Sequence, residues 1–252
     1  MKKQFETKWS RTDLISSLDE FTDLYLNRPI KENDGGMKSP HMFPAWFIVK
    51  QLQPKYLIES GVWKGLGTWF FEKASPKTKI ISIDPCPHFR MYTSPVATYS
   101  TTDFLLNDWA ELPKDDTFIF FDDHQNCIER LKRAKSLGFK RLIVEDNYPY
   151  QQGDCYTPKK VLSKKRYVID AAGNRVWYPH NPDDLNWLEK NISIYQEMPP
   201  IMKPNLTRWG DIWSQDSYST PDALLTQDSL NKYPIFSEEQ KDYTWICYIE
   251  FN

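Results

Sequence analysis

The sequence contains no hydrophobic run long enough to cross a membrane and no excess of charge of one sign. Its longest apolar stretch, Met42 to Val49, is far shorter than the roughly 20 residues that a membrane-spanning helix needs. The first six residues include charges but lead into no apolar stretch, so we expect no secretory signal. Lys and Arg number 32 against 34 Asp and Glu, which argues against a protein dominated by binding to nucleic acid or anionic membranes.

Cysteine is scarce as well. The chain has four cysteines, namely Cys86, Cys127, Cys155 and Cys247. None of them is spaced as CxxC, so we interpret them as reduced thiols of a cytoplasmic protein rather than as a disulfide framework. With 252 residues, 40% of them hydrophobic, the chain can bury a substantial core without disulfides or metals. Membrane, collagenous, disordered and disulfide-scaffold classes are excluded.

Glycine is rare, with nine residues against 18 prolines. Three of the nine nevertheless fall within seven residues, at Gly61, Gly65 and Gly67. Glycine permits backbone conformations and close approaches that other residues resist. The clustering therefore indicates a local turn with a specific purpose.

The pattern of apolar residues predicts helices near the N-terminus and then alternating strands and helices. Residues 10–26 are predicted to form one amphipathic helix capped by Ser10. A second helix is predicted to begin with Ser39 as N-cap and Pro40 as its first residue, and to close before Pro54. Further helices are expected over 68–73 and 127–137, the latter ending in a left-handed C-cap at Gly138.

Short strands separate these helices. We expect them over 56–59, 79–83, 96–99, 117–121, 141–144, 192–195 and 243–251, with a hairpin formed by 167–170 and 175–178. Buried, non-alternating strands that alternate with helices are typical of parallel β-α-β units. The predicted fold is a Rossmann-like, doubly wound α/β sheet, mostly parallel, with helices on both faces and a terminal antiparallel strand. We expect a single domain over 1–252, with an N-terminal helical segment (1–38), a cofactor-binding core (39–150) and an aromatic-rich elaboration (151–252).

The glycine cluster lies where the first strand meets a helix. The strand ends in Glu59, and Gly61 and Gly65 follow as G-x-x-x-G. Asp84 ends the next strand, 23 residues after Gly61, where a carboxylate can bind a ribose diol. A dinucleotide-binding protein would carry G-x-G-x-x-G, but Trp63 occupies the place of its second glycine. The alternative is a turn that merely connects strand and helix.

This region resembles the class I S-adenosylmethionine (SAM)-dependent methyltransferases over rather less than half of the chain. Glu59, Gly61 and Gly65 match the first motif of that family, Asp84 matches its ribose-binding acid, and Asp103 matches a residue near the adenine. The resemblance implies SAM as cofactor. The cofactor-binding residues that we predict are Glu59, Gly61, Gly65, Thr68, Asp84, Asp103 and Asp122.

A second group of acids follows the fourth and fifth strands, as Asp122-Asp123-His124 and Glu145-Asp146-Asn147. Neighbouring strands lie about 5 Å apart and end on the same rim, so these carboxylates should converge and repel one another unless a cation neutralises them. Oxygen ligands of this kind suit Mg²⁺. The alternative is that they are solvated loop acids, one of which caps the next helix.

The acids resemble those of a branch that includes macrolide-sugar O-methyltransferases, cephalosporin-hydroxylase-like proteins and, more remotely, catechol O-methyltransferases. The resemblance implies a divalent metal, Mg²⁺ or another such cation, held by Asp123, Glu145 and Asp146, with Asp122 as the alternative first ligand. We expect His124 to act as general base, with Asp123 as the second catalytic residue. The remaining histidines, His41, His88 and His180, are interpreted as structural.

The C-terminal half is rich in aromatic residues, which can stack on sugar rings or simply fill a core. The basic run 159–166 is interpreted as a solvated helix face rather than a phosphate site. No Asn/Asp-Pro-Pro-aromatic motif of base-amino methylases follows the fourth strand, which disfavours nucleic acid as substrate. The sequence thus predicts a Mg²⁺-dependent O-methyltransferase acting on a hydroxyl of a sugar or glycan, with homo-oligomerisation left open. The rival hypotheses are an iron-dependent hydroxylase on the same scaffold and a non-catalytic glycan- or partner-binding module.

Overall fold

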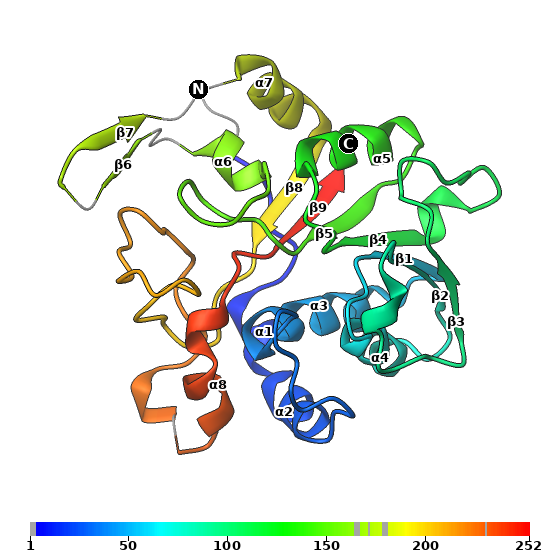
Figure 1. Ribbon diagram of the computed structural model, residues 1–252, viewed down its shortest axis with the longest axis horizontal. Helices are drawn as coiled ribbons and strands as arrows, with labels where there is room; N and C mark the ends of the chain where they lie inside the picture. Colours follow the sequence, from blue (N-terminus) through cyan, green and yellow to red (C-terminus); the bar gives the residue numbers. More distant parts are fainter. Residues whose placement is uncertain (1–3, 164–166, 171, 178–180, 230) are drawn as a thin grey trace.

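The computed structural model describes residues 4–163, 167–170, 172–177, 181–229 and 231–252. Nine strands occur in these ranges: β1 (Tyr56–Ser60), β2 (Lys79–Ile83), β3 (Ala97–Ser100), β4 (Thr117–Phe121), β5 (Arg141–Val144), β6 (Tyr167–Ile169), β7 (Arg175–Trp177), β8 (Ile192–Glu197) and β9 (Cys247–Phe251). Seven of them form one sheet in the order β3-β2-β1-β4-β5-β9-β8 (Figure 1). The expected hairpin forms a separate pair of strands, β6 and β7.

The sheet is parallel except at one place. Strands β1 to β5 pair in parallel, whereas β9 runs antiparallel between β5 and β8. The expected Rossmann-like sheet with a terminal antiparallel strand is therefore confirmed. Because β1, β4 and β5 are parallel neighbours, their carboxyl ends meet on one rim, and this rim carries the site described below.

Eight α-helices surround the sheet in the described ranges: α1 (Arg11–Ile15), α2 (Leu18–Leu26), α3 (Ser39–Leu52), α4 (Leu66–Ala74), α5 (Cys127–Ser136), α6 (Pro158–Leu162), α7 (Pro182–Asn191) and α8 (Pro234–Glu238). Short 3-10 helices lie at Pro87–Phe89, Lys114–Asp116, Gln227–Ser229 and Gln240–Asp242. Helices α1 to α4 cover one face of the sheet, and α5 and α7 cover the other (Figure 1).

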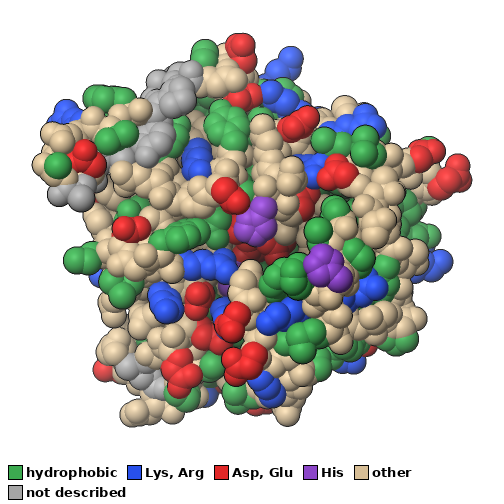
Figure 2. All heavy atoms as spheres, viewed as in Figure 1, with side chains coloured by type: hydrophobic (Ala, Val, Ile, Leu, Met, Phe, Trp, Pro, Cys, Tyr) green, Lys and Arg blue, Asp and Glu red, His purple; other side chains and the backbone are tan. Residues whose placement is uncertain are grey.

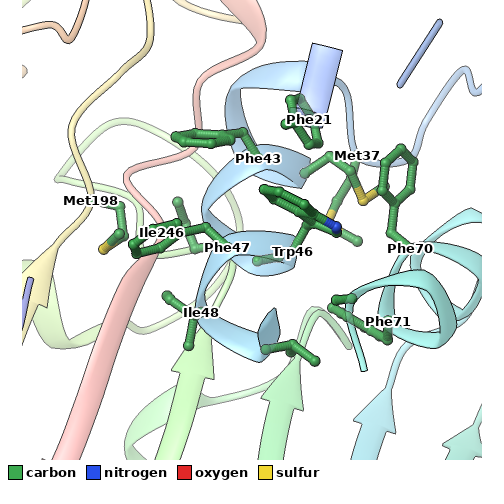
Figure 3. Packing of buried hydrophobic residues seen from close by; sticks show 14 of the residues in the cluster. Phe21, Met37, Phe43, Trp46, Phe47, Ile48, Phe70, Phe71, Met198 and Ile246 are labelled. Atoms are coloured by element: carbon green, nitrogen blue, oxygen red, sulfur yellow. The ribbon is translucent and has the colours of Figure 1, made fainter. Parts of the chain in front are cut away.

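The two faces of the sheet bury separate apolar clusters. In β4, Phe118 and Phe120 pack with the helices of the first face, while Ile119 and Phe121 pack with α5 on the second. Alternate residues of a strand point to opposite faces, so burial of both faces explains why this strand is apolar without interruption. On the first face the aromatic rings of α2, α3 and α4 interlock around Phe21, whose ring centroid lies 5.5 Å from that of Trp46 (Figure 3).

Three expectations about element ends were wrong. The helix expected over 10–26 is broken into α1 and α2, because the hydroxyls of Ser16 and Ser17 donate to the Asp13 carbonyl and compete with the helical pattern. Helix α3 is capped by Lys38 rather than by Ser39, which is its first residue and donates its N–H to a Glu239 carboxylate at 2.7 Å.

The last strand is shorter than expected. It begins at Cys247 rather than at residue 243, because Trp245 has a left-handed backbone with φ of 58°. A residue in that conformation cannot continue a strand. The left-handed C-cap predicted at Gly138 is confirmed, with φ of 89°.

Candidate functional site

The turn after β1 is pressed against the end of β4, and this contact requires glycine. Gly61 has φ of 96°, and a Cβ at this position would lie 1.9 Å from the carbonyl oxygen of Asp122. The backbone N–H of Asp122 in turn donates to the carbonyl of Ser60 at 2.8 Å. The glycine turn therefore places the end of β4 beside the end of β1.

The same turn is held from the side by the strand end of β2. Asp84 accepts hydrogen bonds from the backbone N–H groups of Val62 at 3.2 Å and Trp63 at 2.8 Å. Gly65 is the N-cap of α4 with φ of 88°, and a Cβ there would lie 2.3 Å from the Tyr92 carbonyl oxygen. Gly61 and Gly65 are thus both required by backbone contacts.

Glu59 supports the turn from beneath and is fully buried. Its carboxylate accepts hydrogen bonds from Thr68 Oγ1 and Ser82 Oγ, both at 2.6 Å. Burial raises the pKa of Glu59 to about 7, although these two hydrogen bonds oppose the shift. Glu59 and Thr68, both predicted as cofactor-binding residues, are fully buried and do not line the neighbouring pocket. Glu59 instead lines a small cavity of about 10 Å³ beneath the turn, together with Gly61 and Asp122.

A pocket of about 320 Å³ opens above the turn. It is lined by Gly35, Gly36, Ser60, Gly61, Trp63, Ile83, Asp84, Pro85, Asp103, Asp122, Asp123, His124 and Gln125. The predicted residues Gly61, Asp84, Asp103 and Asp122 therefore all line this pocket. The sequence did not predict that Trp63, Gly35 and Gly36 line this pocket. The available signal for Trp63 was its place within the glycine turn, between Gly61 and Gly65. Volumes of this size are typical of small-molecule sites.

A buried arginine balances part of the negative charge of this pocket. Arg130, 3% of whose side chain is exposed, pairs with both oxygens of Asp103 and, at 3.0 Å, with Asp123 Oδ2. Asp123 also accepts from Ser60 Oγ at 2.7 Å. Burial raises the pKa of Asp123, and the positive charge of Arg130 opposes that shift.

Three other carboxylates gather on the rim, and we call them the acidic cluster: Asp122, Glu145 and Asp146, with ligand oxygens within 4.8 Å of one another. Of the two aspartates that the sequence left open as metal ligand, the structure brings Asp122 to this cluster, whereas Asp123 turns toward Arg130. Burial, followed by the negative charges of the neighbours, raises the pKa of both Asp122 and Asp146 well above the ordinary value. Figure 2 shows acidic side chains beside a histidine in the hollow of this face.

Glu145 is held in position by two buried partners. Thr244 Oγ1 donates to Glu145 Oε1 at 2.9 Å, and His41 Nδ1 contacts the same oxygen. Because His41 Nε2 accepts from the backbone N–H of Lys38, its proton must reside on Nδ1, which donates to Glu145. Burial, followed by the charge of Arg208, lowers the pKa of His41 to about 3, so this imidazole stays neutral. His41 was interpreted as structural, and its partner is a member of the acidic cluster.

His124 has φ of 53°, and its Nδ1 lies 3.3 Å from both Asp146 Oδ2 and Asp154 Oδ1. Hydrogen bonding to Cys155, followed by the charges of Asp146 and Asp154, raises the pKa of His124 to about 10. At neutral pH the ring is therefore an imidazolium in this arrangement. Base function would require that the charge of Asp146 be compensated.

A second pocket of about 510 Å³ begins on the other side of His124. It is lined by His124, Tyr148, Gln151, Gly153, Asp154, Arg208 and Trp209. Tyr148 and Trp209 meet edge to face with ring centroids 5.0 Å apart, and Arg208 Nη1 lies 3.4 Å from the Tyr148 hydroxyl. The two pockets share His124 as a lining residue.

The other residues singled out in the sequence, where the structure describes them, do not line either pocket. His88 is exposed in the short 3-10 helix Pro87–Phe89, with its ring beside that of Phe89, and His180 lies outside the described residues. The helix after β4 is capped by Asn126, not by an acid. In the basic run, Lys159 Nζ pairs with Glu197 at 2.6 Å and Lys160 Nζ donates to the Cys155 carbonyl at 2.6 Å, so neither is simply solvated. Residues 164–166 lie outside the described ranges.

All four cysteines are free thiols, as expected. Helices in the described part of the chain are each too short or too polar to cross a membrane.

No protein-family model matches the sequence, and no curated protein matches it either. Similar solved structures include SAH-bound PaMTH1 methyltransferase from Podospora anserina, at 13% identity over 53% of this chain and 62% of that chain, with a TM-score of 0.39. Another is the SAH complex of cmcI-N160, at 14% identity over 69% and 89%, with a TM-score of 0.40.

A third is the O-methyltransferase TomG from Streptomyces achromogenes with SAM, at 12% identity over 56% and 66%, with a TM-score of 0.37. Similarity at this level does not carry the activity of those proteins over to this chain. We therefore infer the function from the pockets and the acidic cluster of this chain.

Proposed function

We propose that this protein is a SAM-dependent methyltransferase that transfers a methyl group to a hydroxyl of a sugar or glycan, with a divalent cation such as Mg²⁺ at the acidic cluster. The observation that carries the proposal is the meeting of two pockets at His124. Methyl transfer needs a donor and an acceptor held in line and in contact, and most of its acceleration comes from that positioning. Two pockets that share a lining residue support the proposal of such an arrangement.

The first pocket suits a cationic cofactor. Its wall carries Asp84, Asp103 and Asp122, and Arg130 offsets only part of that charge through Asp103 and Asp123. A sulfonium and an ammonium group would be attracted to such a wall. The glycine turn brings backbone close to the ligand, as glycine-rich turns before a helix do in nucleotide sites. We assign the adenosine and methionine parts of SAM to this pocket.

The acidic cluster suits a hard cation. It offers oxygen ligands only, which Mg²⁺ prefers, and Asp146 Oδ2 is buried without a hydrogen bond. Three carboxylates this close together, two of them buried and Asp122 half-buried, repel one another unless a cation is present. When bound there by Asp122, Glu145 and Asp146, Mg²⁺ would lower the pKa of an acceptor hydroxyl.

The second pocket suits a sugar. Trp209 and Tyr148 offer aromatic faces, and Arg208, Gln151 and Asp154 offer polar groups for hydroxyls. An iron-dependent hydroxylase would instead use two histidines and one carboxylate. In the described residues only His124 faces the cluster with exposed ring atoms, because both nitrogens of His41 are engaged.

The test is a transfer assay with methyl-labelled SAM against a panel of mono- and oligosaccharides, read by mass spectrometry. We expect a product heavier by one methyl group, formed in Mg²⁺ and lost in EDTA. Trp209→Ala should raise KM for the acceptor and leave SAH binding unchanged, whereas Trp177→Ala, at an exposed site on β7, serves as control. Labelled product on an amine or on the protein itself, with none on any sugar, would contradict the acceptor assignment.

A further inference from the structure

His124, Asp146 and Cys155 form a second group of metal-binding side chains beside the acidic cluster. One ligand atom from each, including Sγ of Cys155, lies within 4.8 Å of the other two. The side chains of Asp146 and Cys155 are buried, whereas 52% of the His124 side chain is exposed. An ion could therefore reach the group from the side of the second pocket.

Cys155 is fixed in place by its surroundings rather than lying on a free loop. The next residue, Tyr156, accepts the backbone N–H of Cys127 at 3.0 Å, which ties this loop to the start of α5. Lys160 Nζ donates to the Cys155 carbonyl at 2.6 Å, and Thr157 caps α6. The thiol is thus positioned by contacts on both sides of it.

Two observations indicate a ligand here. Asp146 Oδ2 is buried and accepts no hydrogen bond, and its charged neighbour is His124 Nδ1 at 3.3 Å. A metal ion would supply this oxygen with the direct partner that it lacks, and would replace the proton of His124 as the positive charge beside it. In addition, Asp154 Oδ1 lies 3.3 Å from His124 Nδ1 and 3.4 Å from Cys155 Sγ, so a fourth oxygen donor is at hand.

We propose that His124, Asp146 and Cys155 bind Zn²⁺, with Asp154 available as the fourth ligand. Nitrogen, sulfur and oxygen donors are those that zinc takes in proteins, while Mg²⁺ avoids sulfur. Donors on one tetrahedral zinc ion, with bonds of about 2.0 to 2.3 Å, lie about 3.3 to 3.6 Å apart. The His124–Asp146 and Cys155–Asp154 separations already match that geometry.

The zinc site is distinct from the acidic cluster in its donors, but the two share Asp146. Zinc binding would therefore take Asp146 away from the acidic cluster. Binding itself does not depend on the proposed methyl transfer. Substitutions can separate the two sites, because Cys155 belongs only to the first and Glu145 only to the second.

The test is metal titration of the purified full chain with Co²⁺ as a spectroscopic probe for zinc, followed by Zn²⁺ competition against a chromophoric chelator. We expect one Co²⁺ per chain, a thiolate-to-cobalt charge-transfer band in the near ultraviolet, and displacement by Zn²⁺. Cys155→Ser should abolish the band and weaken Zn²⁺ binding by at least about tenfold, since even outer-shell changes cost that much. His124→Asn, at a half-exposed position, should weaken binding similarly and serves if the serine variant does not fold.

Two controls make the result specific. Cys86→Ser removes the exposed cysteine near His88 and should leave the band intact. Glu145→Gln should leave Co²⁺ binding intact even if it abolishes Mg²⁺ binding or methyl transfer. A band that persists in Cys155→Ser, a band lost in Cys86→Ser, or the lack of any band in the wild type would each overturn the proposal.

Discussion

The side chain of Glu145 owes its position to two residues from opposite ends of the chain. His41 comes from α3 and Thr244 from the segment before β9, and both bind Oε1. In metal sites, a residue that orients a ligand in this way commonly contributes about 10- to 100-fold to metal affinity. His41 is therefore a positioning residue for the acidic cluster.

Replacing His41 tests this role. His41→Phe keeps a buried ring but removes the hydrogen bond to Glu145, so we expect Mn²⁺ affinity to fall by about 10- to 100-fold. The measurement is a Mn²⁺ titration followed by electron paramagnetic resonance of the free ion. His88→Phe, in the exposed 3-10 helix Pro87–Phe89, is the matched control and should bind Mn²⁺ as the wild type does. Equal affinity in both variants would contradict the role of His41.

Asp122 and Asp123 are adjacent in sequence and differ in surroundings. Without metal, Asp122→Asn relieves repulsion within the acidic cluster, so we expect a gain of about 1 to 3 kcal/mol in free energy of unfolding in EDTA. Asp123→Asn weakens the pair with buried Arg130, so we expect a loss of about 1 to 3 kcal/mol. Urea unfolding measures both.

Metal affinity should separate the same two variants. Asp122→Asn should weaken Mn²⁺ binding by at least about tenfold, while Asp123→Asn should leave it nearly unchanged. If Asp123→Asn weakened Mn²⁺ binding and Asp122→Asn did not, Asp123 rather than Asp122 would be the metal ligand.

Ionisation of Glu59 should make the free energy of unfolding fall as the pH rises. Its pKa is about 7 in the folded chain against 4.5 as the ordinary value, so the folded state holds the proton more tightly. The stabilisation by this neutral carboxyl is present below pH 4.5 and is lost as the pH rises to 7. The loss amounts to about 3 kcal/mol. Glu59→Gln cannot ionise, so between pH 5 and pH 8 its stability should improve relative to wild type by roughly this amount. A stability difference that does not change with pH, in urea unfolding, would disprove the assignment.

At the scale of the elements, the residues that follow the strands are the part of the site that the sequence predicts best. The sequence was sufficient to predict that acids after β4 and β5 would converge, because parallel neighbouring strands end on one rim. It was not sufficient to decide which of Asp122 and Asp123 joins Glu145. That choice depends on the last paired residue of β4 and on Arg130, which reaches back from α5.

Other contacts in the site could not be predicted from the sequence either. His41 and Glu145 are 104 residues apart in the chain, and no pattern in the sequence of α3 predicts that they touch. Gly35 and Gly36 reach the first pocket because their loop packs on the ring of Trp63. Each contact depends on tertiary packing between segments distant in the chain.

The glycine turn can be tested against a glycine of similar backbone but open surroundings. Gly61 and Gly210 have φ of 96° and 91°, yet an added Cβ meets the Asp122 carbonyl at Gly61 and nothing within 4 Å at Gly210. Gly210→Ala should cost about 1 to 2 kcal/mol from backbone strain alone. Gly61→Ala adds the clash and should cost about 3 to 5 kcal/mol in total. Equal losses in urea unfolding would mean that the turn can move away from β4.

At the scale of the whole molecule, the first half of the chain supplies the first pocket and the second half supplies much of the second. Arg208 and Trp209 come from the long segment between β8 and β9, which the aromatic composition had suggested as the acceptor side. The rim of β1, β4 and β5 lies between them and presents His124 to both. The two pockets that we assign to the donor and the acceptor thus meet at His124.

Calorimetric titration with S-adenosylhomocysteine, once in Mg²⁺ and once in EDTA, is the decisive experiment for the methyltransferase proposal. We expect micromolar binding of one molecule per chain in both buffers, because the first pocket is built from the glycine turn and the acids at the strand ends. An Asp84→Ala variant should lose most of that affinity. Failure to bind in either buffer would contradict the methyltransferase proposal.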